Sequence, residues 1–310
     1  MAAGSLHSTD TTASAADSPL ARSPGYSRKL HLHTLIKNLT PSHFAHEFNE
    51  SVVHTTSLES AAAAATPSVV ALEAAHKLAF RSGLGNSLFA DPHEPVGLTD
   101  VHEFAASLAK RQVGVVGTGL TQDELVATLK DVFTEELAGQ EGSKAATSAT
   151  KYFGGEARIP IDLHNVAEGA KPTLIVAFGS TKAATPEQLV LPYLLAPRPS
   201  VKWSAGAAPL AVDEAGTTVE AFTQSYSDAA LLVVEIQAEG SKRLSAAGKY
   251  VVGALQAFKA DEESLKKAVA QAKTATAEQW DDSASLREVL ASAVRRPFLR
   301  TLVGDNPALC

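Results

Sequence analysis

The sequence predicts an α+β fold. Short apolar runs at 113–117, 173–178 and 229–236 are typical of buried strands, because they contain almost no polar residues. Apolar residues at helical spacing occupy much of the chain between and around these runs. Strands flank helices in both halves without strict alternation, which favours α+β over a doubly wound parallel sheet. With 310 residues, the chain has room for two domains of ordinary size.

Composition excludes several classes of protein. Charged residues make up 20% and hydrophobic residues 45% of the chain, which is typical of a globular protein. The net charge of −7 argues against a nucleic-acid-binding protein, which usually carries a basic stripe. We expect no membrane span, since no uncharged apolar stretch has the necessary length. The single cysteine, Cys310, excludes an intramolecular disulfide and a cysteine-rich metal site.

Four helices are predicted in the first half. The first begins at Thr40–Pro41, and its apolar face contains Phe44, Phe48 and Val52. The second begins at Thr66 as the cap, ends at Gly83 and Gly85, and its largely apolar face consists of Val69, Leu72, His76 and Phe80.

The next two helices flank the predicted strand at 113–117. One is predicted to be capped by Thr99, and its apolar side consists of Val101, Phe104, Ala105 and Leu108. The other begins with a capping box formed by Thr121 and Glu124.

The second half is predicted to begin with a strand at 152–163, YFGGEARIPIDL, followed by the strand at 173–178. A helix starts at Thr185 and should be kinked or shortened by Pro192. A weakly alternating strand at 219–226 precedes the buried strand at 229–236. Two helices follow: the first over 241–259 with Leu244, Gly248, Val251, Val252 and Leu255 inward, the second capped by Asp261 with Leu265, Ala268, Val269 and Ala272 inward.

The domain boundary is placed at 138–151, because this stretch is small, polar and without apolar periodicity. It is predicted to link a first domain over 30–137 with a second over 152–294. Residues 1–29 are predicted to form a disordered tail, since they are rich in Ser, Thr, Ala and Pro. Residues 295–310 form an atypical tail.

Two motifs suggest chemistry, and each has a simpler structural explanation. Gly117 and Gly119 fit the start of a dinucleotide fingerprint, but Gln122 occupies the position where a third glycine is needed, so a tight turn is favoured. His43 and His46 are one helical turn apart, but H-x-x-H-E is neither zinc-peptidase motif, so no metal site is expected there.

Three further sites contain residue types that can act in catalysis or binding. His76 lies on an otherwise apolar helix face, which favours a hydrogen-bonded core histidine over a catalytic one. His164 and Asp162 cannot be assembled with a serine into a triad from sequence alone. Trp203, in the Pro/Gly/Ala-rich loop over 197–211, either contacts a partner or folds back onto its own domain. We therefore expect no catalytic, metal-binding or cofactor-binding residues. The candidate interaction loop comprises Ser200, Lys202, Trp203, Ser204, Gly206 and Pro209.

Several segments resemble the M16 metallopeptidase superfamily. HEFNESV, ALEAAHKLAFRSGLGNSLF and VGLTDVHEFAASLAKRQVGVVGTGL resemble the later half of an M16 N-terminal domain. KYFGGEARIPID, LIVAFGSTKAATPEQLVL, PSVKWSAGAAPLA and YSDAALLVVEI resemble one branch of it, the core 2 subunits of the mitochondrial cytochrome bc1 complex, complex III. The resemblance covers roughly residues 30–290.

The resemblance implies two related M16 domains, of which the first is incomplete here, because the upstream portion that carries the zinc helix of active relatives is missing from the sequence. It further implies a non-catalytic subunit without cofactor, on the matrix side of the inner membrane. The implied partners are a core protein 1-like subunit and other complex III subunits. The alternative is a processing-peptidase-like subunit that binds presequences beside a zinc-bearing partner.

The sequence departs from the family pattern in two further places. Pro197 and Pro199 stand where the processing peptidase's non-catalytic subunit has glycines. The ending RRPFLRTLVGDNPALC does not resemble a family C-terminus.

Overall fold

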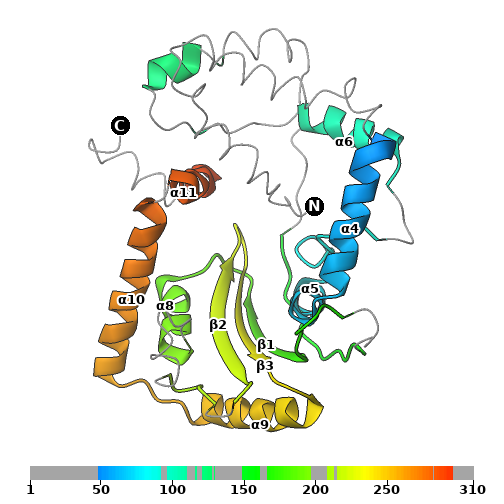
Figure 1. Cartoon of the computed structure of the whole chain (residues 1–310). Helices are drawn as coiled ribbons and strands as arrows, with labels where there is room; N and C mark the ends of the chain where they lie inside the picture. Colours follow the sequence, from blue (N-terminus) through cyan, green and yellow to red (C-terminus); the bar gives the residue numbers. More distant parts are fainter. Residues whose placement is uncertain are drawn as a thin grey trace. The chain divides into compact units, whose positions relative to one another are not determined.

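The computed structural model describes a mixed helix and strand fold (Figure 1). The described residues are 48–91, 96–109, 116, 121–127, 129, 149–160, 166–196, 208–212, 215–281 and 283–295. The predictions for both tails, for 30–47 and for most of the 113–117 strand and the 138–151 linker lie outside them. The chain divides into two compact units; the first comprises Leu58–Phe89 and Ser148–Glu278.

A three-stranded antiparallel sheet organises the first unit, in the order β1-β3-β2. The strands are β1 (Thr173–Ser180), β2 (Thr218–Ser225) and β3 (Ala230–Gln237). Val234 of β3 lies opposite Val176 of β1 and Ala221 of β2. Three of the four strands predicted for the second half, at 173–178, 219–226 and 229–236, are thus confirmed. The almost uninterrupted apolar run of β3 suits the central position, since both of its faces are covered.

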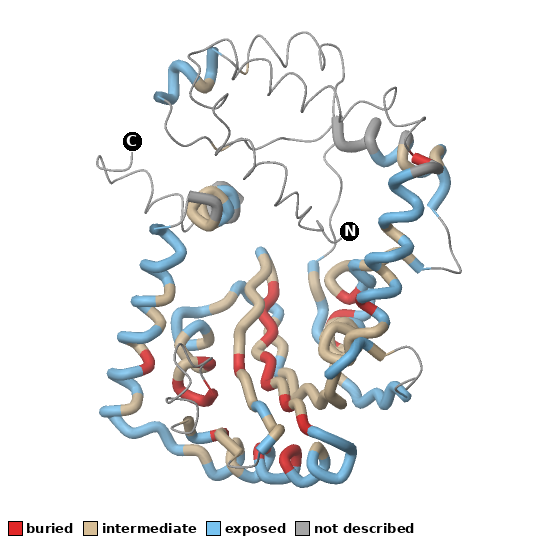
Figure 2. The backbone as a smooth tube through the Cα atoms, viewed as in Figure 1, coloured by how far each residue is buried: buried red, intermediate tan, exposed pale blue. Residues whose placement is uncertain are grey.

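One face of the sheet is closed by two helices, α8 (Pro186–Leu195) and α9 (Ser241–Ala257). Burial is concentrated on the strands and on the helix residues that face them (Figure 2). The core of this face consists of Leu195, Ala196, Leu210, Ala221, Val234, Ile236, Ala247 and Val251. All of its members are apolar, so it is the part of the unit in which burial contributes most to stability.

The sequence predicted the start of α8 correctly. Thr185 and Gln188 form a reciprocal capping box at its first turn. The helix continues through Pro192 for three more residues. Proline has no N–H to donate to the carbonyl four residues earlier, which belongs to Gln188. The hydroxyl of Thr223 on β2 donates to that carbonyl at 2.8 Å instead, which ties α8 to the sheet.

The two C-terminal helices follow the prediction with two corrections. On α9, Leu244, Val251 and Leu255 pack in the core as expected, but Val252 is 39% exposed. In α10 (Glu262–Asp281), Asp261 caps the first turn by accepting the Ser264 N–H at 3.0 Å. Its Ala268 is buried, but Leu265 is 44% exposed rather than inward. The apolar stripe of each helix is therefore narrower than its periodicity suggested.

The other face of the sheet is covered by α5 (Pro67–Phe80), which packs mainly against β1. The sequence predicted the helix but assigned it to the first domain. Its Ala79 and Phe80 form a second core with Ala229, Leu231 and Val233. An apolar helix face does not specify which sheet it covers, and here it covers the sheet formed by the second half of the chain.

The described residues also form a π-helix, η3 (Phe48–Val52), and three more α-helices, α4 (Val53–Ala64), α6 (Leu98–Ala109) and α11 (Ser283–Arg295). Thr99 is not the cap of α6, because the helix already begins at Leu98. The Gly97 N–H instead donates to the Asp100 carboxylate at 2.8 Å. The capping box of Thr121 and Glu124 is confirmed by two reciprocal bonds of 3.0 and 3.3 Å.

The predicted strand at 152–163 does not form over 152–160, its described part, where the backbone has no regular structure and is largely exposed. Gly154 and Gly155 have φ values of +80° and +149°, which turn the chain away from an extended path. The Phe153 N–H donates to the Ala79 carbonyl at the end of α5, at 2.8 Å. This segment is therefore fixed against a helix end rather than paired in the sheet.

Candidate functional site

The candidate interaction loop lies largely outside the described residues. Ser200, Lys202, Trp203, Ser204 and Gly206 belong to the part that is not described, whereas Pro209 is described and exposed. The structure therefore shows how the two ends of this loop are held.

Both ends of the loop are fixed in the closed core. Ala196, at the entry, is 1% exposed, and its carbonyl accepts the Ala221 N–H of β2 at 3.0 Å. Leu210, near the exit, is fully buried and donates its N–H to the Leu195 carbonyl at 3.2 Å. The chain thus leaves and re-enters the core beside the end of α8.

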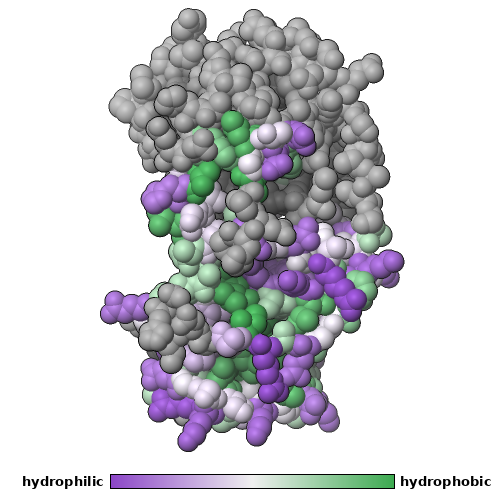
Figure 3. Space-filling view, turned by 90° about the vertical axis from the view of Figure 1, so that its right-hand side faces the viewer, coloured by the Kyte–Doolittle hydropathy of each residue, from purple (hydrophilic) through white to green (hydrophobic). Residues whose placement is uncertain are grey.

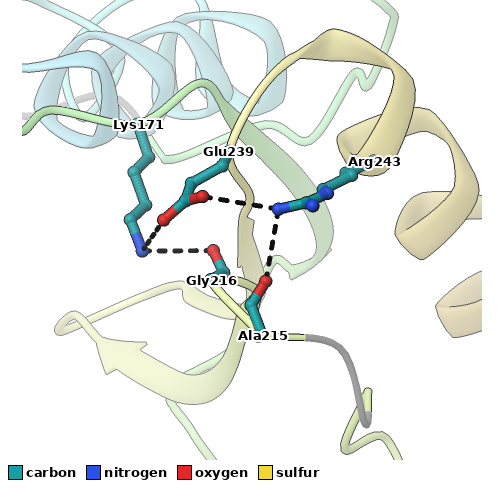
Figure 4. A network of polar contacts seen from close by, with 5 residues as sticks. All are labelled: Lys171, Ala215, Gly216, Glu239 and Arg243. Atoms are coloured by element: carbon teal, nitrogen blue, oxygen red, sulfur yellow. Dashed lines mark hydrogen bonds and ion pairs between the residues drawn. The ribbon is translucent and has the colours of Figure 1, made fainter.

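A polar network fixes the segment that follows the loop (Figure 4). Lys171 donates to the Gly216 carbonyl at 3.1 Å and lies 3.9 Å from the Glu239 carboxylate. Arg243 approaches the same carboxylate at 3.3 Å and the Ala215 carbonyl at 3.4 Å. The charged groups are partly exposed, so each ion pair contributes little stability. Together they fix the position of the loop exit relative to β3 and α9.

Glycine is required at position 216 in this network. Its φ is +83°, and a Cβ atom there would lie 2.7 Å from the Glu239 carboxyl carbon. Lys171, Glu239 and Arg243 were not predicted from the sequence. Glu239 and Arg243 are four residues apart, but Lys171 lies far from both in the chain, and no short motif marks the three.

The described anchors of the loop hold a segment in place and show no chemistry of their own. No group of three or more His, Cys, Asp or Glu residues that could hold a metal ion occurs among the described residues.

Of the other residues that the sequence suggested as functional, most lie outside the described residues, and His76 has a structural role. Gln122 lies exposed in a helical turn, and the glycines before it are outside the described residues, as are His43, His46, Asp162 and His164. The expected hydrogen-bonded state of His76 is confirmed: Nδ1 lies 2.8 Å from the Leu72 carbonyl and Nε2 2.7 Å from the Tyr226 hydroxyl. Because a carbonyl only accepts, Nδ1 carries a proton.

Tyr226 links this histidine to the sheet. Its ring packs edge-on against both His76 and Phe80, with centroid separations of 6.0 and 6.2 Å. Burial raises the pKa of Tyr226. Its phenol therefore stays neutral at physiological pH and serves as a structural hydrogen-bonding group.

A pair of carboxylates that the sequence did not single out lies on the α5 side of the sheet. Glu220 of β2 and Glu235 of β3 are directly opposite each other, and both are half-buried. Glu235 accepts a hydrogen bond from Gln237 at 2.6 Å. Like charges in opposite positions on paired strands repel each other, and Glu220, like Glu235, also takes part in a polar interaction.

Comparison with known proteins gives consistent relatives. Subunit 2 of the mitochondrial cytochrome b-c1 complex from Cryptococcus neoformans var. grubii is 38% identical over 89% of this chain. The same subunit from Yarrowia lipolytica and from Neurospora crassa is 34% identical over 79% and 75% of this chain, respectively. This chain spans only 63%, 57% and 51% of those three relatives. No protein-family model matches the chain.

Solved structures show the same fold. A chain of complex III2 from Candida albicans, with Inz-5 bound, has a TM-score of 0.67 and 16% identity, covering 91% of this chain and 68% of that one. A putative M16-like peptidase from Alicyclobacillus acidocaldarius has a TM-score of 0.54 and 14% identity, covering 87% of this chain and 65% of its own. In the described part of the chain, no helix is both long and apolar enough to cross a membrane. The resemblance inferred from the sequence is confirmed: over most of its length, this chain is a relative of cytochrome b-c1 complex subunit 2.

Proposed function

We propose that this chain acts as a non-catalytic structural subunit of mitochondrial respiratory complex III and supports assembly and stability of the complex. The observation that carries this proposal is its similarity in sequence to fungal subunit 2 of the cytochrome b-c1 complex. The relatives are larger than this chain, so the role concerns the part that it shares with them. Its expected partners are a core protein 1-like subunit and other complex III subunits.

The finer features of the proposal follow from the M16 resemblance. By that resemblance, the chain contains a partial M16 N-terminal-type domain over 30–137 and a C-terminal-type domain over 152–294, with α5 of the first packed on the sheet of the second. It lies on the matrix side of the inner membrane as a peripheral subunit and has no peptidase activity of its own, as the resemblance to the core 2 subunits implies. The loop over 197–211, including Trp203, contacts a neighbouring subunit. Its fixed ends support this role.

One observation favours the second candidate function, presequence binding beside a zinc-bearing partner. Glu220 and Glu235 lie near Phe222, on the face of the sheet that α5 covers mainly over β1. Half-buried carboxylates beside an aromatic ring suit a basic amphipathic segment, because they provide both charge and apolar contact.

Affinity purification of the tagged full chain from fungal mitochondria in mild detergent separates the two functions. The structural role predicts co-purification of cytochromes b and c1 in stoichiometric amounts. The presequence role predicts a soluble heterodimer that cleaves a fluorogenic presequence peptide and loses this activity with a chelator. Recovery of the heterodimer without the cytochromes would overturn the proposed function. A variant with both Glu220→Gln and Glu235→Gln serves as a control, because only presequence binding should require these carboxylates.

A further inference from the structure

A strained turn lies immediately after α5. Arg81 has φ +60° and ψ −65°, and it is the one non-glycine residue with positive φ among the described residues. The Ser82 N–H donates to the Phe80 carbonyl across it at 2.7 Å, which makes Arg81 the centre of a γ-turn of the rare, strained form. Such strain persists only where surrounding contacts maintain it, and it is concentrated at functional sites.

Two contacts maintain the turn. Gly85 packs directly against the Arg81 backbone, where a Cβ atom would lie 2.7 Å from the Arg81 nitrogen. The Arg81 guanidinium lies over the Phe153 ring, 4.2 Å from its centroid. The arginine is therefore held in a defined direction while remaining exposed.

Phe153 and Tyr152 belong to the irregular segment beside α5. Tyr152 packs edge-on against Phe80 with the ring centroids 6.5 Å apart, and its ring lies directly against Gly179 of β1. The Asp228 carboxylate accepts the Thr150 N–H at 3.0 Å, which fixes the start of the segment. Even so, Tyr152 and Phe153 remain 40% and 46% exposed.

Leu88 is an exposed apolar residue in the loop that follows the turn. It is 71% exposed, yet its backbone is fixed, because its N–H donates to the Glu73 carboxylate of α5 at 2.7 Å. Ser87 donates to the same carboxylate. Glu73 and Lys77 share one side of α5, and the Arg81 N–H donates to the Lys77 carbonyl at 3.0 Å just after the helix ends. Figure 3 shows that hydrophobic patches bordered by hydrophilic side chains occur on the surface.

Positive groups outnumber negative ones here: Lys77, Arg81 and Lys151 stand against Glu73, whose carboxylate accepts hydrogen bonds from Ser87 and Leu88. Lys77 and Lys151 are exposed and make no ion pair with any described residue. Glu156, five residues after Lys151, is ion-paired with Arg158 at 3.0 Å. We define Arg81, Leu88, Tyr152 and Phe153, with Lys77 and Lys151, as the Arg81 surface.

We propose that the Arg81 surface is a docking site for an acidic segment of a neighbouring protein subunit, one that carries an aliphatic side chain between its carboxylates. The carboxylates would pair with the three cations, and the aliphatic group would contact the aromatic rings and Leu88. Arginine and aromatic residues are the types enriched at the energetic centres of interfaces. The proposal rests on the proposed function, since the neighbour is a subunit of complex III.

An anionic lipid surface could also attract cations and aromatic residues. The geometry favours a protein partner, because the Arg81 guanidinium is fixed by Phe153 and the Leu88 backbone by Glu73. Fixed directions of this kind lower the entropic cost of matching a second shaped surface. A fluid lipid surface requires no such match.

Site-specific photocrosslinking in assembled complex III identifies the partner. A benzophenone amino acid replaces Leu88 in the tagged full chain, and the crosslinked peptide is identified by mass spectrometry. The control carries it at Tyr250 on α9, which is 53% exposed. We expect Leu88, but not Tyr250, to crosslink to an acidic peptide of another subunit. Crosslinking at Leu88 only to lipid, to a basic peptide or to nothing would overturn the proposal.

Charge reversal provides the quantitative test. Arg81→Glu together with Lys151→Glu should lower the fraction of chain recovered in complex III by about tenfold, whereas Lys249→Glu on α9 should leave it unchanged. Circular dichroism of each purified variant confirms that it is folded, and the Phe153→Ala variant provides an uncharged second probe. Equal recovery of the variants and the parent chain would contradict this inference but leave the proposed function intact. If the parent chain itself is absent from the complex, both fail.

Discussion

The two faces of the sheet differ in composition and in cover. The core between the sheet and helices α8 and α9 contains eight buried residues, all of them apolar, and the Thr223 hydroxyl beside it is bonded to α8. The face under α5 is apolar beside Phe80, but it carries Glu220 and Glu235 toward one end, and α5 packs mainly against β1. The first face is built for stability. The second combines a smaller core with half-buried charge and, at the end of α5, a strained turn.

This difference explains where binding features are found. A closed apolar face leaves no polar group free to recognise a partner, and mutations there act on the whole fold. A partly covered face can retain charged and aromatic groups at its margin, because they do not have to be buried. The Arg81 surface and the carboxylate pair both lie on the α5 side.

The largest expected effect is on the closed face. Ile236→Ala should lower the free energy of unfolding by about 2–5 kcal/mol, because the fully buried side chain leaves a cavity between the sheet and its helices. Ile175→Ala on the α5 side should cost roughly 1–2 kcal/mol, because this side chain is only partly buried. Urea denaturation of the full chain measures both. Equal losses would remove the distinction between the faces.

Displacing the Tyr152 ring from β1 should have the next largest effect on the free energy of unfolding. Gly179→Val places a side chain where the Tyr152 ring lies, so the ring must leave β1. We expect a loss of about 1–3 kcal/mol, as in other overpacked sites. Proteolysis should become faster within 149–160, while α9 stays protected. An unchanged cleavage pattern would show that this segment does not depend on its contact with the sheet.

The bond between Thr223 and Gln188 tests how α8 is tied to β2. Thr223→Val should cost about 1–2 kcal/mol, because it leaves the Gln188 carbonyl beside Pro192 without a donor. In a Pro192→Ala background the new N–H can reach this carbonyl, so the same change should cost less. A double-mutant cycle of thermal melts measures the difference. Identical costs in both backgrounds would show that the Thr223 hydroxyl does not replace the N–H that Pro192 lacks.

The smallest expected effect concerns acid stability on the α5 side. Burial raises the pKa of Asp228, but the hydrogen bonds from Thr150 and Ser227 outweigh it, so the pKa is lowered overall. The stabilisation from Asp228 is therefore present above the ordinary carboxyl pKa of about 3.9 and is lost as the pH falls through the lower, folded value. Asp228→Asn should thus be less stable at pH 7 and converge with the parent chain near pH 2. Parallel stability curves would contradict this.

Elements with a strong local signal were predicted from the sequence. The strands β1, β2 and β3, the capping box of α8 and the helices α9 and α10 have clear apolar patterns or caps. The placement of α5 was not predictable, because its apolar face fits any sheet of suitable shape. The prediction of a strand at 152–163 was wrong over its described part, because Gly154 and Gly155 adopt positive φ angles and turn the chain. The residue pattern of the segment does not indicate this turn.

The binding features were harder to predict. The Arg81 turn depends on Gly85 and Phe153, of which the second lies more than seventy residues away. The Glu220–Glu235 pair depends on the register of β2 against β3, which is defined only once the two strands are paired in the structure. Chain-distant contacts of this kind have no local motif. The candidate loop, by contrast, was marked by its composition, and the structure adds the positions of its two ends.

Hydrogen–deuterium exchange of the full chain, free and within complex III, tests most directly whether the α5 side is used for binding while the closed face holds the fold. We predict that amides in 81–89 and 149–155 become at least about tenfold more protected on assembly, while those of α9 and β3 keep the same protection in both states. Gained protection confined to α9, with no change at 81–89, would contradict the assignment of the binding role to the α5 side.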